Sequence, residues 1–338
     1  MGETVNARIL GVGHHVPANV VTNDDLMRVM DTTDEWIQQR TGIRQRHFVA
    51  EDAGPADLAI HAAREALDEA KVAPADLDLI LLGTLSPDID FPASASLLQR
   101  HLGVGGMPVM DVRNQCSGFL YMLATADAYI RSGAARHVLV VGAETHSTGL
   151  DLSTEGREVG VIFGDGAGAV VLGPEPHPKR GILSTHLHSE GKYAEKLMVE
   201  PPSSRVMPRV SADMLTGPGS RLWPRMEGRY VFKHAVTRFT EVINEALEAN
   251  GLTAADIDLL IPHQANLRIS QLVAMGFELP EEKVFNNIQR YGNTTAASIP
   301  IALYEARKEG RVPAGSLTCL ASFGAGFTWG AGVIEWAA

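Results

Sequence analysis

The stretch Val112-Arg113-Asn114-Gln115-Cys116-Ser117-Gly118-Phe119 joins a predicted strand to a predicted helix. Met107–Val112 is predicted to form a short buried strand, and apolar residues then recur at helical spacing until Gly133 ends the helix. Cys116 therefore lies at a helix N-terminus, where the helix dipole and free backbone N–H groups should lower the pKa of its thiol. The alternative is a small buried core residue, which is what most free cysteines are, and the stretch alone leaves both interpretations open.

Composition limits the classes to which the chain can belong. Its 338 residues are 45% hydrophobic and 20% charged, enough for two domain-sized units with a large core. The formal net charge of −11 argues against nucleic acid or an anionic membrane surface as the main partner. The sequence lacks the apolar run of about 18 residues that a membrane span needs, and Met1–Asn6 lacks the pattern of a signal peptide. Two cysteines, Cys116 and Cys319, allow neither a disulfide framework nor a zinc set, so we expect no metal and a cytoplasmic location.

Strand and helix patterns alternate along most of the chain, which predicts the α/β class. Thr22 and Thr33 each precede acidic residues and are predicted N-caps of short helices. Gly164–Leu172 is predicted to be a tight turn that enters a strand. Gly191–Glu227 is the least regular stretch and is predicted to be a long, partly mobile loop. The other predicted strands cover residues 7–13, 77–82, 137–142, 259–262 and 317–336, and the other helices cover 56–70, 92–102, 231–250, 269–276 and 296–308.

Parts of the chain repeat at a fixed offset. A helix–turn–strand unit that begins at Glu65 recurs 180 positions later at Glu245. Two helix-ending glycines further along, Gly133 and Gly310, are 177 positions apart.

The second offset predicts that three polar side chains lie near one another. Carried back along the two helices, it sets Cys116 opposite Asn293, and His263 closes the duplicated strand. Because equivalent loops of a duplicated unit lie near a pseudo-twofold axis, we expect Cys116 and Asn293 to face each other with His263 nearby. A structural role for His263 and helix capping by Asn293 are the alternatives.

Trp36 and Arg40 lie four positions apart and therefore share a helix face. An indole and a guanidinium on one face could hold an adenine or a phosphate. A packed tryptophan beside a solvated arginine fits the spacing equally well.

At these residues the sequence resembles the thiolase superfamily, and most of all β-ketoacyl-acyl-carrier-protein synthase III, the acyl-CoA-primed condensing enzyme. The matching motifs occur in order along nearly the whole chain and are far more specific together than alone. They are Asp34–Ile37, Arg40–Arg44, Cys116–Phe119, Phe163–Gly168, His263–Asn266, Gly292–Ser298 and Phe323–Gly330. The resemblance implies a thiolase-like fold with a duplicated βαβαβαββ unit in five αβαβα layers. It also implies two halves, residues 1–175 and 176–338, and a tight homodimer.

The resemblance implies roles for single residues as well. Cys116 is the acylated nucleophile, and His263 and Asn293 complete the triad. The backbone N–H groups of Cys116 and Ala325 form the oxyanion hole. The residues implied to bind CoA or to flank its channel are Thr32, Trp36, Arg40, Arg157, Asn266, Arg268 and Phe323, and Phe91 is implied to line the acyl pocket of the partner subunit.

The implied activity, in fatty-acid biosynthesis, moves an acyl group from acyl-CoA to Cys116 and condenses it with a malonyl thioester as carbon dioxide leaves. His263 and Asn293 would hydrogen-bond the thioester oxygen of the malonyl group. The CoA thioester is a substrate, and no cofactor is implied.

The chain departs from the family pattern in three places that matter for function. The segment Gly191–Glu227 is longer than in the typical priming enzyme and borders the expected tunnel entrance, where it could select the acyl group or its carrier or be an ordinary surface loop. Asn114 and Gln115 precede the cysteine where the family usually has small residues. The short helix after His263 carries little positive charge, so the malonyl carrier, expected to be the acidic acyl carrier protein, could also be CoA. Three other activities stay open: condensation without decarboxylation, for which Glu144 is a possible base, acyl transfer to another nucleophile, and an inactive partner subunit.

Overall fold

The computed structural model describes residues 5–50, 52–200, 202–214 and 222–337, and most of its strands belong to two sheets. The first sheet holds, in spatial order, β1 (Asn6–His15), β7 (Gly166–Glu175), β6 (Val138–Glu144), β4 (Leu79–Gly83) and β5 (Val109–Val112). The second holds β11 (Leu259–Pro262), β12 (Leu317–Gly324), β13 (Thr328–Glu335) and β8 (Gly181–Ser189).

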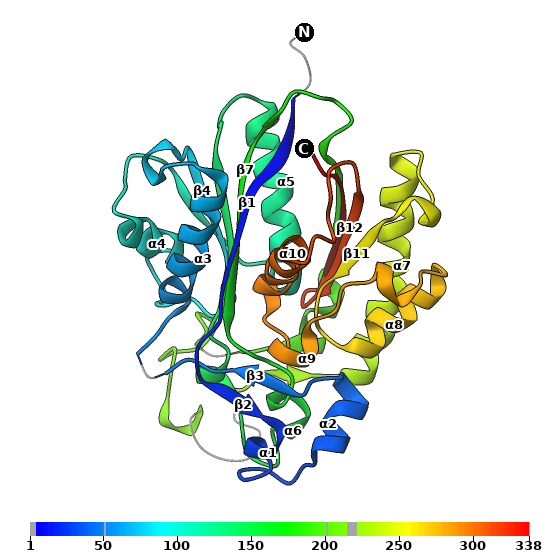
Figure 1. Cartoon of the computed structure of the whole chain (residues 1–338). Helices are drawn as coiled ribbons and strands as arrows, with labels where there is room; N and C mark the ends of the chain where they lie inside the picture. The colour runs from blue at the N-terminus through cyan, green and yellow to red at the C-terminus, as the bar shows by residue number, and fades with distance from the viewer. Residues whose placement is uncertain (1–4, 51, 201, 215–221, 338) are drawn as a thin grey trace.

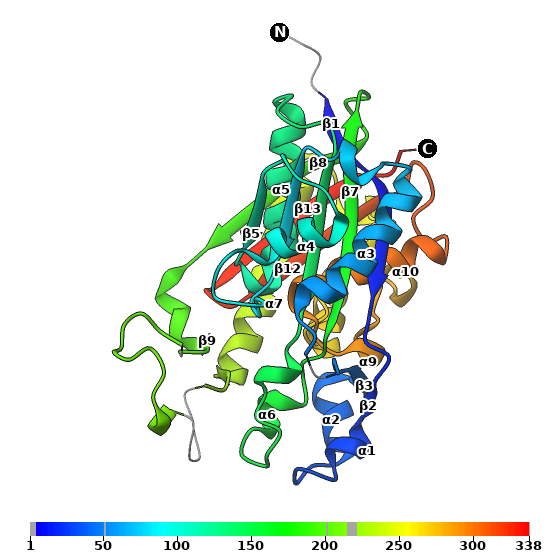
Figure 2. The ribbon, with the colours of Figure 1, turned by 90° about the vertical axis from the view of Figure 1, so that its left-hand side faces the viewer.

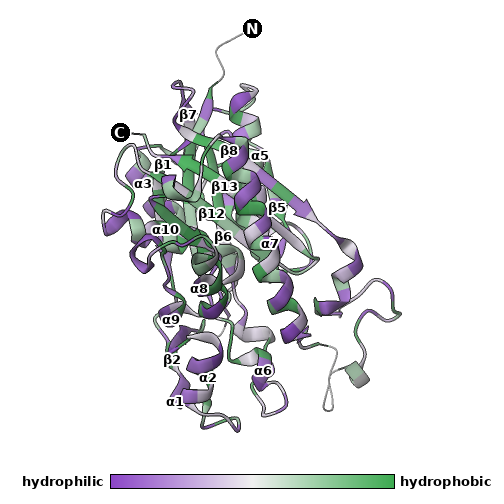
Figure 3. Cartoon of the chain, turned by 90° about the vertical axis from the view of Figure 1, so that its right-hand side faces the viewer, coloured by the Kyte–Doolittle hydropathy of each residue, from purple (hydrophilic) through white to green (hydrophobic). Residues whose placement is uncertain are grey.

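Helices lie on both outer faces and between the sheets, so the expected αβαβα layering is confirmed (Figure 1). The outer layer of the first sheet is α3 (Pro55–Ala70) and α4 (Ser94–Leu102). The middle layer is α5 (Gly118–Arg131) and α10 (Ser298–Lys308), and the last is α7 (Gly228–Ala249) and α8 (Leu267–Gly276). Hydrophobic residues are concentrated on the strands, and hydrophilic ones on the outward face of α7 (Figure 3).

The central strands are almost entirely apolar because helices cover both faces of the sheet, and the exception is Glu144 at the end of β6. Every residue of β4 and β6 is buried, and the two strands pair in parallel. Met107–Val112, predicted as a buried strand, forms the shorter β5, whose residues are only half-buried. That prediction is wrong about burial, because β5 is the edge strand of its sheet.

Small elements form the end of the molecule below the sheets in Figure 1. The two predicted N-caps are confirmed, since the Thr22 hydroxyl accepts from the backbone N–H of Asp25 and the Thr33 hydroxyl from that of Trp36, at 3.2 and 3.1 Å. The elements are β2 (Val20–Thr22), α1 (Asn23–Leu26), α2 (Asp34–Thr41), β3 (Gln45–His47), α6 (Arg157–Gly160) and α9 (Ile288–Tyr291).

The segment Gly191–Glu227 is irregular, as predicted, and stands away from the sheets in Figure 2. Its described part holds the short helices η4 (Gly191–Lys196) and η5 (Ala212–Met214), and a two-stranded ribbon of β9 (Leu197–Met198) and β10 (Arg225–Met226). Residues 201 and 215–221 of this predicted loop lie outside the described residues. Among the helices described, none is both long and apolar enough to cross a membrane.

The repeat is visible in two matching turns, but the offset of 177 is wrong at the cysteine. A short helix, η2 (Gln115–Ser117), precedes α5, and η8 (Thr295–Ala297) precedes α10. Gln115 and Thr295 both have a left-handed backbone, with φ of 44° and 50°. The turns therefore match at an offset of 180, which pairs Cys116 with Ala296. The offset changes because α5 has 14 residues and α10 has 11.

Candidate active site

The middle layer begins with the turn that carries Cys116. The thiol lies in η2, two residues before α5, and the residue is 7% exposed. Burial raises the pKa of Cys116 to about 12, and the nearby carboxylate of Glu144 adds to this rise. The expectation of a lowered pKa is therefore wrong, because the loss of hydration outweighs the effect of the helix N-terminus.

The end of β12 packs directly on this turn. A Cβ on Gly324 would lie 2.6 Å from the Cys116 Cβ and 3.2 Å from its Sγ, so only glycine fits here. The backbone N–H groups of Cys116 and Ala325 form hydrogen bonds with the sulfur that partly oppose the rise in its pKa. The structure thus brings the two N–H groups of the predicted oxyanion hole to one atom.

His263 directly follows β11 and is held in place on both sides. Its backbone N–H donates to the Ala321 carbonyl of β12 at 2.8 Å, and Nδ1 lies 2.5 Å from the Ser298 hydroxyl oxygen. Nε2 is buried and has no hydrogen-bond partner among the described residues. Burial lowers the pKa of His263 to about 3, so the imidazole is neutral at working pH.

Asn293 lies just before η8, and its backbone is fixed by two hydrogen bonds. Its N–H donates to the Ile162 carbonyl at 2.9 Å, and its carbonyl accepts from Gly164 at 3.1 Å. The side-chain Oδ1 accepts from the Thr295 N–H at 2.8 Å, which leaves the Nδ2 donor on the other branch of the amide. The turns η2 and η8 pack on each other, and His263 contacts Ser298 directly after η8, so Cys116, His263 and Asn293 belong to neighbouring segments at one end of the two sheets.

Glu144, the possible base of a condensation without decarboxylation, is a buried carboxylate at the end of β6. It accepts hydrogen bonds from Thr84, Leu85 and Ser86, of which the Ser86 hydroxyl is nearest at 2.7 Å. Burial raises its pKa to about 7. Most of these donors contact Oε2, so Glu144 holds the loop after β4 in place.

Four of the predicted CoA contacts form one cluster around α2. The guanidinium carbon of Arg40 lies 4.4 Å from the centre of the Trp36 ring, and that of Arg157 lies 5.4 Å from it. Asn266 joins the cluster because its Nδ2 donates to the Arg40 carbonyl at 2.8 Å. The indole therefore has two cations at its face and could stack on a planar, phosphorylated ligand.

The other residues predicted to contact CoA or the acyl group lie in different surroundings. Thr32, just before α2, has a buried hydroxyl with no partner among the described residues. Arg268 of α8 packs over the Phe232 ring of α7 at 5.6 Å. Phe323 is buried at the end of β12, whereas Phe91 is 80% exposed in the loop between β4 and α4.

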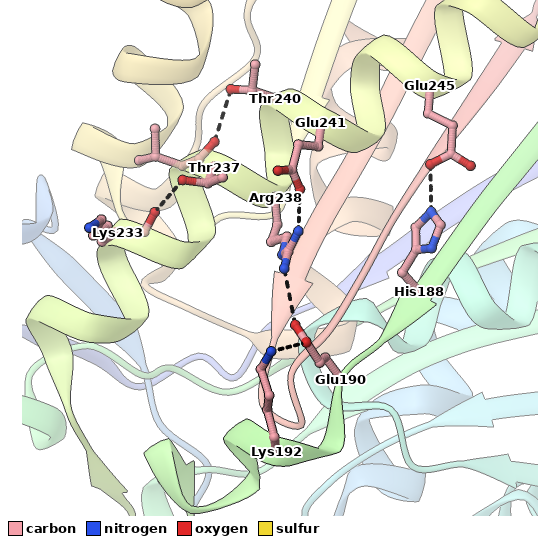
Figure 4. A network of polar contacts seen from close by, with 10 residues as sticks. His188, Glu190, Lys192, Lys233, Thr237, Arg238, Thr240, Glu241 and Glu245 are labelled. Atoms are coloured by element: carbon pink, nitrogen blue, oxygen red, sulfur yellow. Dashed lines mark hydrogen bonds and ion pairs between the residues drawn. The ribbon is translucent and has the colours of Figure 1, made fainter.

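A polar network supports the turn that carries Ala325 (Figure 4). Glu190, just past β8, makes two backbone hydrogen bonds with Phe327, of 2.8 and 3.0 Å. Its carboxylate binds Lys192 and, at 3.1 Å, Arg238 of α7. The network therefore ties the oxyanion turn to the outer helix layer.

No group of three or more His, Cys, Asp or Glu side chains in the described part of the chain could hold a metal ion.

Five alternating layers, with a cysteine turn, a histidine and an asparagine at one end of the two sheets, define a thiolase-fold acyltransferase. Comparison with known proteins supports this assignment. The chain matches the family model described as 3-oxoacyl-[acyl-carrier-protein (ACP)] synthase III at residues 110–191, and the model of that family's C-terminal part at 247–336.

Relatives match over the full length. A β-ketoacyl-[acyl-carrier-protein] synthase III of Xanthomonas euvesicatoria pv. vesicatoria is 46% identical over 99% of this chain and 100% of its own. One from Rhodospirillum centenum is 47% identical over 97% of this chain and 98% of its own. The crystal structure of 3-oxoacyl-[acyl-carrier-protein] synthase III from Aquifex aeolicus superposes with a TM-score of 0.89 at 43% identity, covering 98% and 100% of the two chains.

The chain belongs to the 3-oxoacyl-[acyl-carrier-protein] synthase III family. It is an acyltransferase that catalyses a Claisen condensation, and it forms a 3-oxoacyl thioester. The sequence motifs identified the main residues of this site but not the side chains that hold those residues in place. Ser298, whose hydroxyl lies beside His263, could have been identified because it is the last residue of the Gly292–Ser298 motif. His146, described below, carried no motif signal.

Proposed function

We propose that Cys116 accepts an acyl group from acyl-CoA and that the acyl group is then condensed with a malonyl thioester carried by acyl carrier protein. The observation that carries the proposal is the buried Nε2 of His263, which has no partner among the described residues, at the same end of the sheets as the thiol. A buried polar atom without a protein partner is costly unless a ligand satisfies it. The carrier is proposed from the names of the relatives.

In the first step, the Cys116 sulfur attacks the carbonyl carbon of acyl-CoA. The N–H groups of Cys116 and Ala325 stabilise the oxyanion of the tetrahedral intermediate. The C–S bond to CoA breaks, the acyl–Cys116 thioester forms, and the thiol proton leaves with CoA as its free thiol. Since the resting thiol has a pKa of about 12, it gives up its proton as the substrate is attacked rather than before.

In the second step, His263 and Asn293 act on the malonyl group. The mechanism uses the tautomer in which the Ser298 hydroxyl donates to Nδ1 of His263, 2.5 Å away, and Nε2 carries the imidazole proton. Nε2–H and the Asn293 Nδ2–H then stabilise the enolate that forms as the bond to carbon dioxide breaks. The enolate carbon attacks the acyl–Cys116 carbonyl, and the sulfur leaves as a thiolate that takes up a proton from solvent to restore the thiol.

Trp36, Arg40 and Arg157 are proposed to bind the nucleotide end of CoA. An adenine can stack on the indole while the two guanidinium groups meet phosphate oxygens. Asn266 supports the site through the Arg40 carbonyl, with Thr32 and Arg268 at its border.

A homodimer is proposed on two features of the first sheet. The edge strand β5 is half-buried and offers unpaired backbone groups to another strand. Phe91, close to that edge in sequence, is 80% exposed, which suits insertion into a partner subunit's acyl pocket.

The segment Gly191–Glu227 is proposed to help select the acyl group, because its Arg209 binds Asp90, the neighbour of Phe91, at 2.7 Å.

The test follows both half-reactions in the purified protein. Acyl-CoA should give an acyl-enzyme, and malonyl-acyl carrier protein should then release one carbon dioxide for each 3-oxoacyl product. Malonyl-CoA offered in parallel distinguishes the carrier. Product without carbon dioxide, or no product from either malonyl thioester, would reject a decarboxylating condensation.

A further inference from the structure

His146 is a buried histidine that the steps above do not use. It lies two residues past β6, is 7% exposed, and its ring packs 4.7 Å from that of Phe163. Asp165 fixes the backbone beside it, because its carboxylate accepts from the Ser147 N–H at 2.9 Å and from the Ser147 hydroxyl. The imidazole therefore has a defined orientation, with Nε2 on the hydroxyl of Thr295.

Thr295 joins this histidine to the candidate site. Its hydroxyl contacts His146, and its backbone N–H donates to Oδ1 of Asn293 at 2.8 Å. Thr295 is fully buried and has a φ of 50°, a conformation that is strained for a β-branched residue and persists only where its surroundings hold it. The contact with His146 is one of the interactions that hold Thr295 in that conformation.

The Asn293 amide depends on Thr295 because its backbone is already fixed by Ile162 and Gly164. Rotation of the side chain remains, and the Thr295 N–H selects the rotation in which Oδ1 faces η8. Nδ2 then occupies the other branch of the amide, as the donor that the malonyl thioester needs. Phe163 reinforces this link, since it pairs with Asn293 along the backbone and packs on the His146 ring.

We propose that His146 is a positioning residue that holds Asn293 through Thr295, and so serves condensation with the malonyl group rather than acyl transfer to Cys116. This inference rests on the proposed role of Asn293. The imidazole stays uncharged because burial lowers its pKa to about 3, so its effect is geometric and adds no charge near the thiol.

The experiment measures the two half-reactions separately. Acyl transfer is followed by intact mass after mixing with acyl-CoA, and condensation by chasing the preloaded acyl-enzyme with malonyl-acyl carrier protein. His146→Leu removes the ring nitrogen at similar volume and should slow condensation about tenfold, the effect of one net hydrogen bond. Acyl transfer should stay close to the rate of the unaltered enzyme. His146→Gln, whose amide can reach the same hydroxyl, should restore most of the condensation.

A second pair of variants tests the route through Thr295. Thr295→Val keeps the shape and the N–H but removes the hydroxyl, so it should match His146→Leu, and the double variant should be no slower than either alone. Thr295→Val also carries the test if His146→Leu does not fold. In an Asn293→Ala background, His146→Leu should cause no further loss.

Three results would overturn the proposal. If His146→Leu slowed both half-reactions equally, His146 would have a general structural role. If condensation were unchanged in both His146→Leu and Thr295→Val, the proposed link from His146 through Thr295 to Asn293 would be wrong. An additional loss in the Asn293→Ala background would mean that His146 acts elsewhere. If Asn293→Ala itself condensed at the unaltered rate, the proposed role of Asn293 would fail instead, and with it the target that His146 is proposed to hold.

Discussion

Replacing Gly324 by alanine should disable acyl transfer while leaving the fold intact. The added Cβ would lie 2.6 Å from the Cys116 Cβ and 3.1 Å from its backbone nitrogen. Carbon atoms in contact are separated by about 3.5–4.0 Å, so the β12 end and the cysteine turn would have to move apart by roughly 1 Å. That movement would take the Ala325 N–H out of reach of the oxyanion, and losing one such donor slows catalysis by about a hundredfold to a thousandfold.

Gly332 on the neighbouring strand β13 supplies the matched control. A Cβ there would meet nothing closer than 3.6 Å, an ordinary contact, so Gly332→Ala should acylate at the unaltered rate. The assay is the initial rate of acyl-adduct formation by intact mass, with the thermal unfolding midpoint of each variant as the check on folding. If folded Gly324→Ala acylated as fast as Gly332→Ala, the proposed close packing of the oxyanion turn on Cys116 would be refuted.

Three further predictions concern the thiol, the second half-reaction and CoA. Because the thiolate fraction rises with pH up to a pKa of about 12, alkylation of Cys116 without added acyl-CoA should rise steadily up to about pH 9; a plateau below that pH would contradict the raised pKa. His263→Ala and Asn293→Ala should lose condensation by at least about a hundredfold and retain more of their self-acylation; equal loss of both activities would contradict the division into half-reactions. Trp36→Ala should raise the KM for acyl-CoA and leave alkylation of Cys116 unchanged, and an unaltered KM would remove the indole from the CoA site.

Local signals in the sequence were enough to predict much of the fold. The caps at Thr22 and Thr33 depend on residues within three positions, and both predictions are confirmed. β11 was predicted with its observed limits, because a short apolar run bounded by polar residues marks a buried strand. The five layers followed from the ordered motifs, which no single stretch would have supported.

Properties that arise from packing could not be predicted in this way. The pKa of Cys116 depends on burial and on Glu144, which lies 28 positions away in the sequence and meets the thiol only in the folded chain. The pairing of Cys116 with Ala296 depends on the unequal lengths of α5 and α10, which glycine spacing misjudged. The half-buried state of β5 depends on its place at the sheet edge, which is set by how the other strands of the sheet pair.

The most direct test of the account locates the acyl group and then removes it. The enzyme is incubated with acyl-CoA, digested and mapped by mass spectrometry, alongside Cys116→Ala and Cys319→Ala. The account predicts one acyl group on the peptide that contains Cys116, present in Cys319→Ala, absent in Cys116→Ala, and lost as a 3-oxoacyl product when a malonyl thioester is added. An acyl group that remained in Cys116→Ala, or that a malonyl thioester could not discharge from Cys116, would contradict the account.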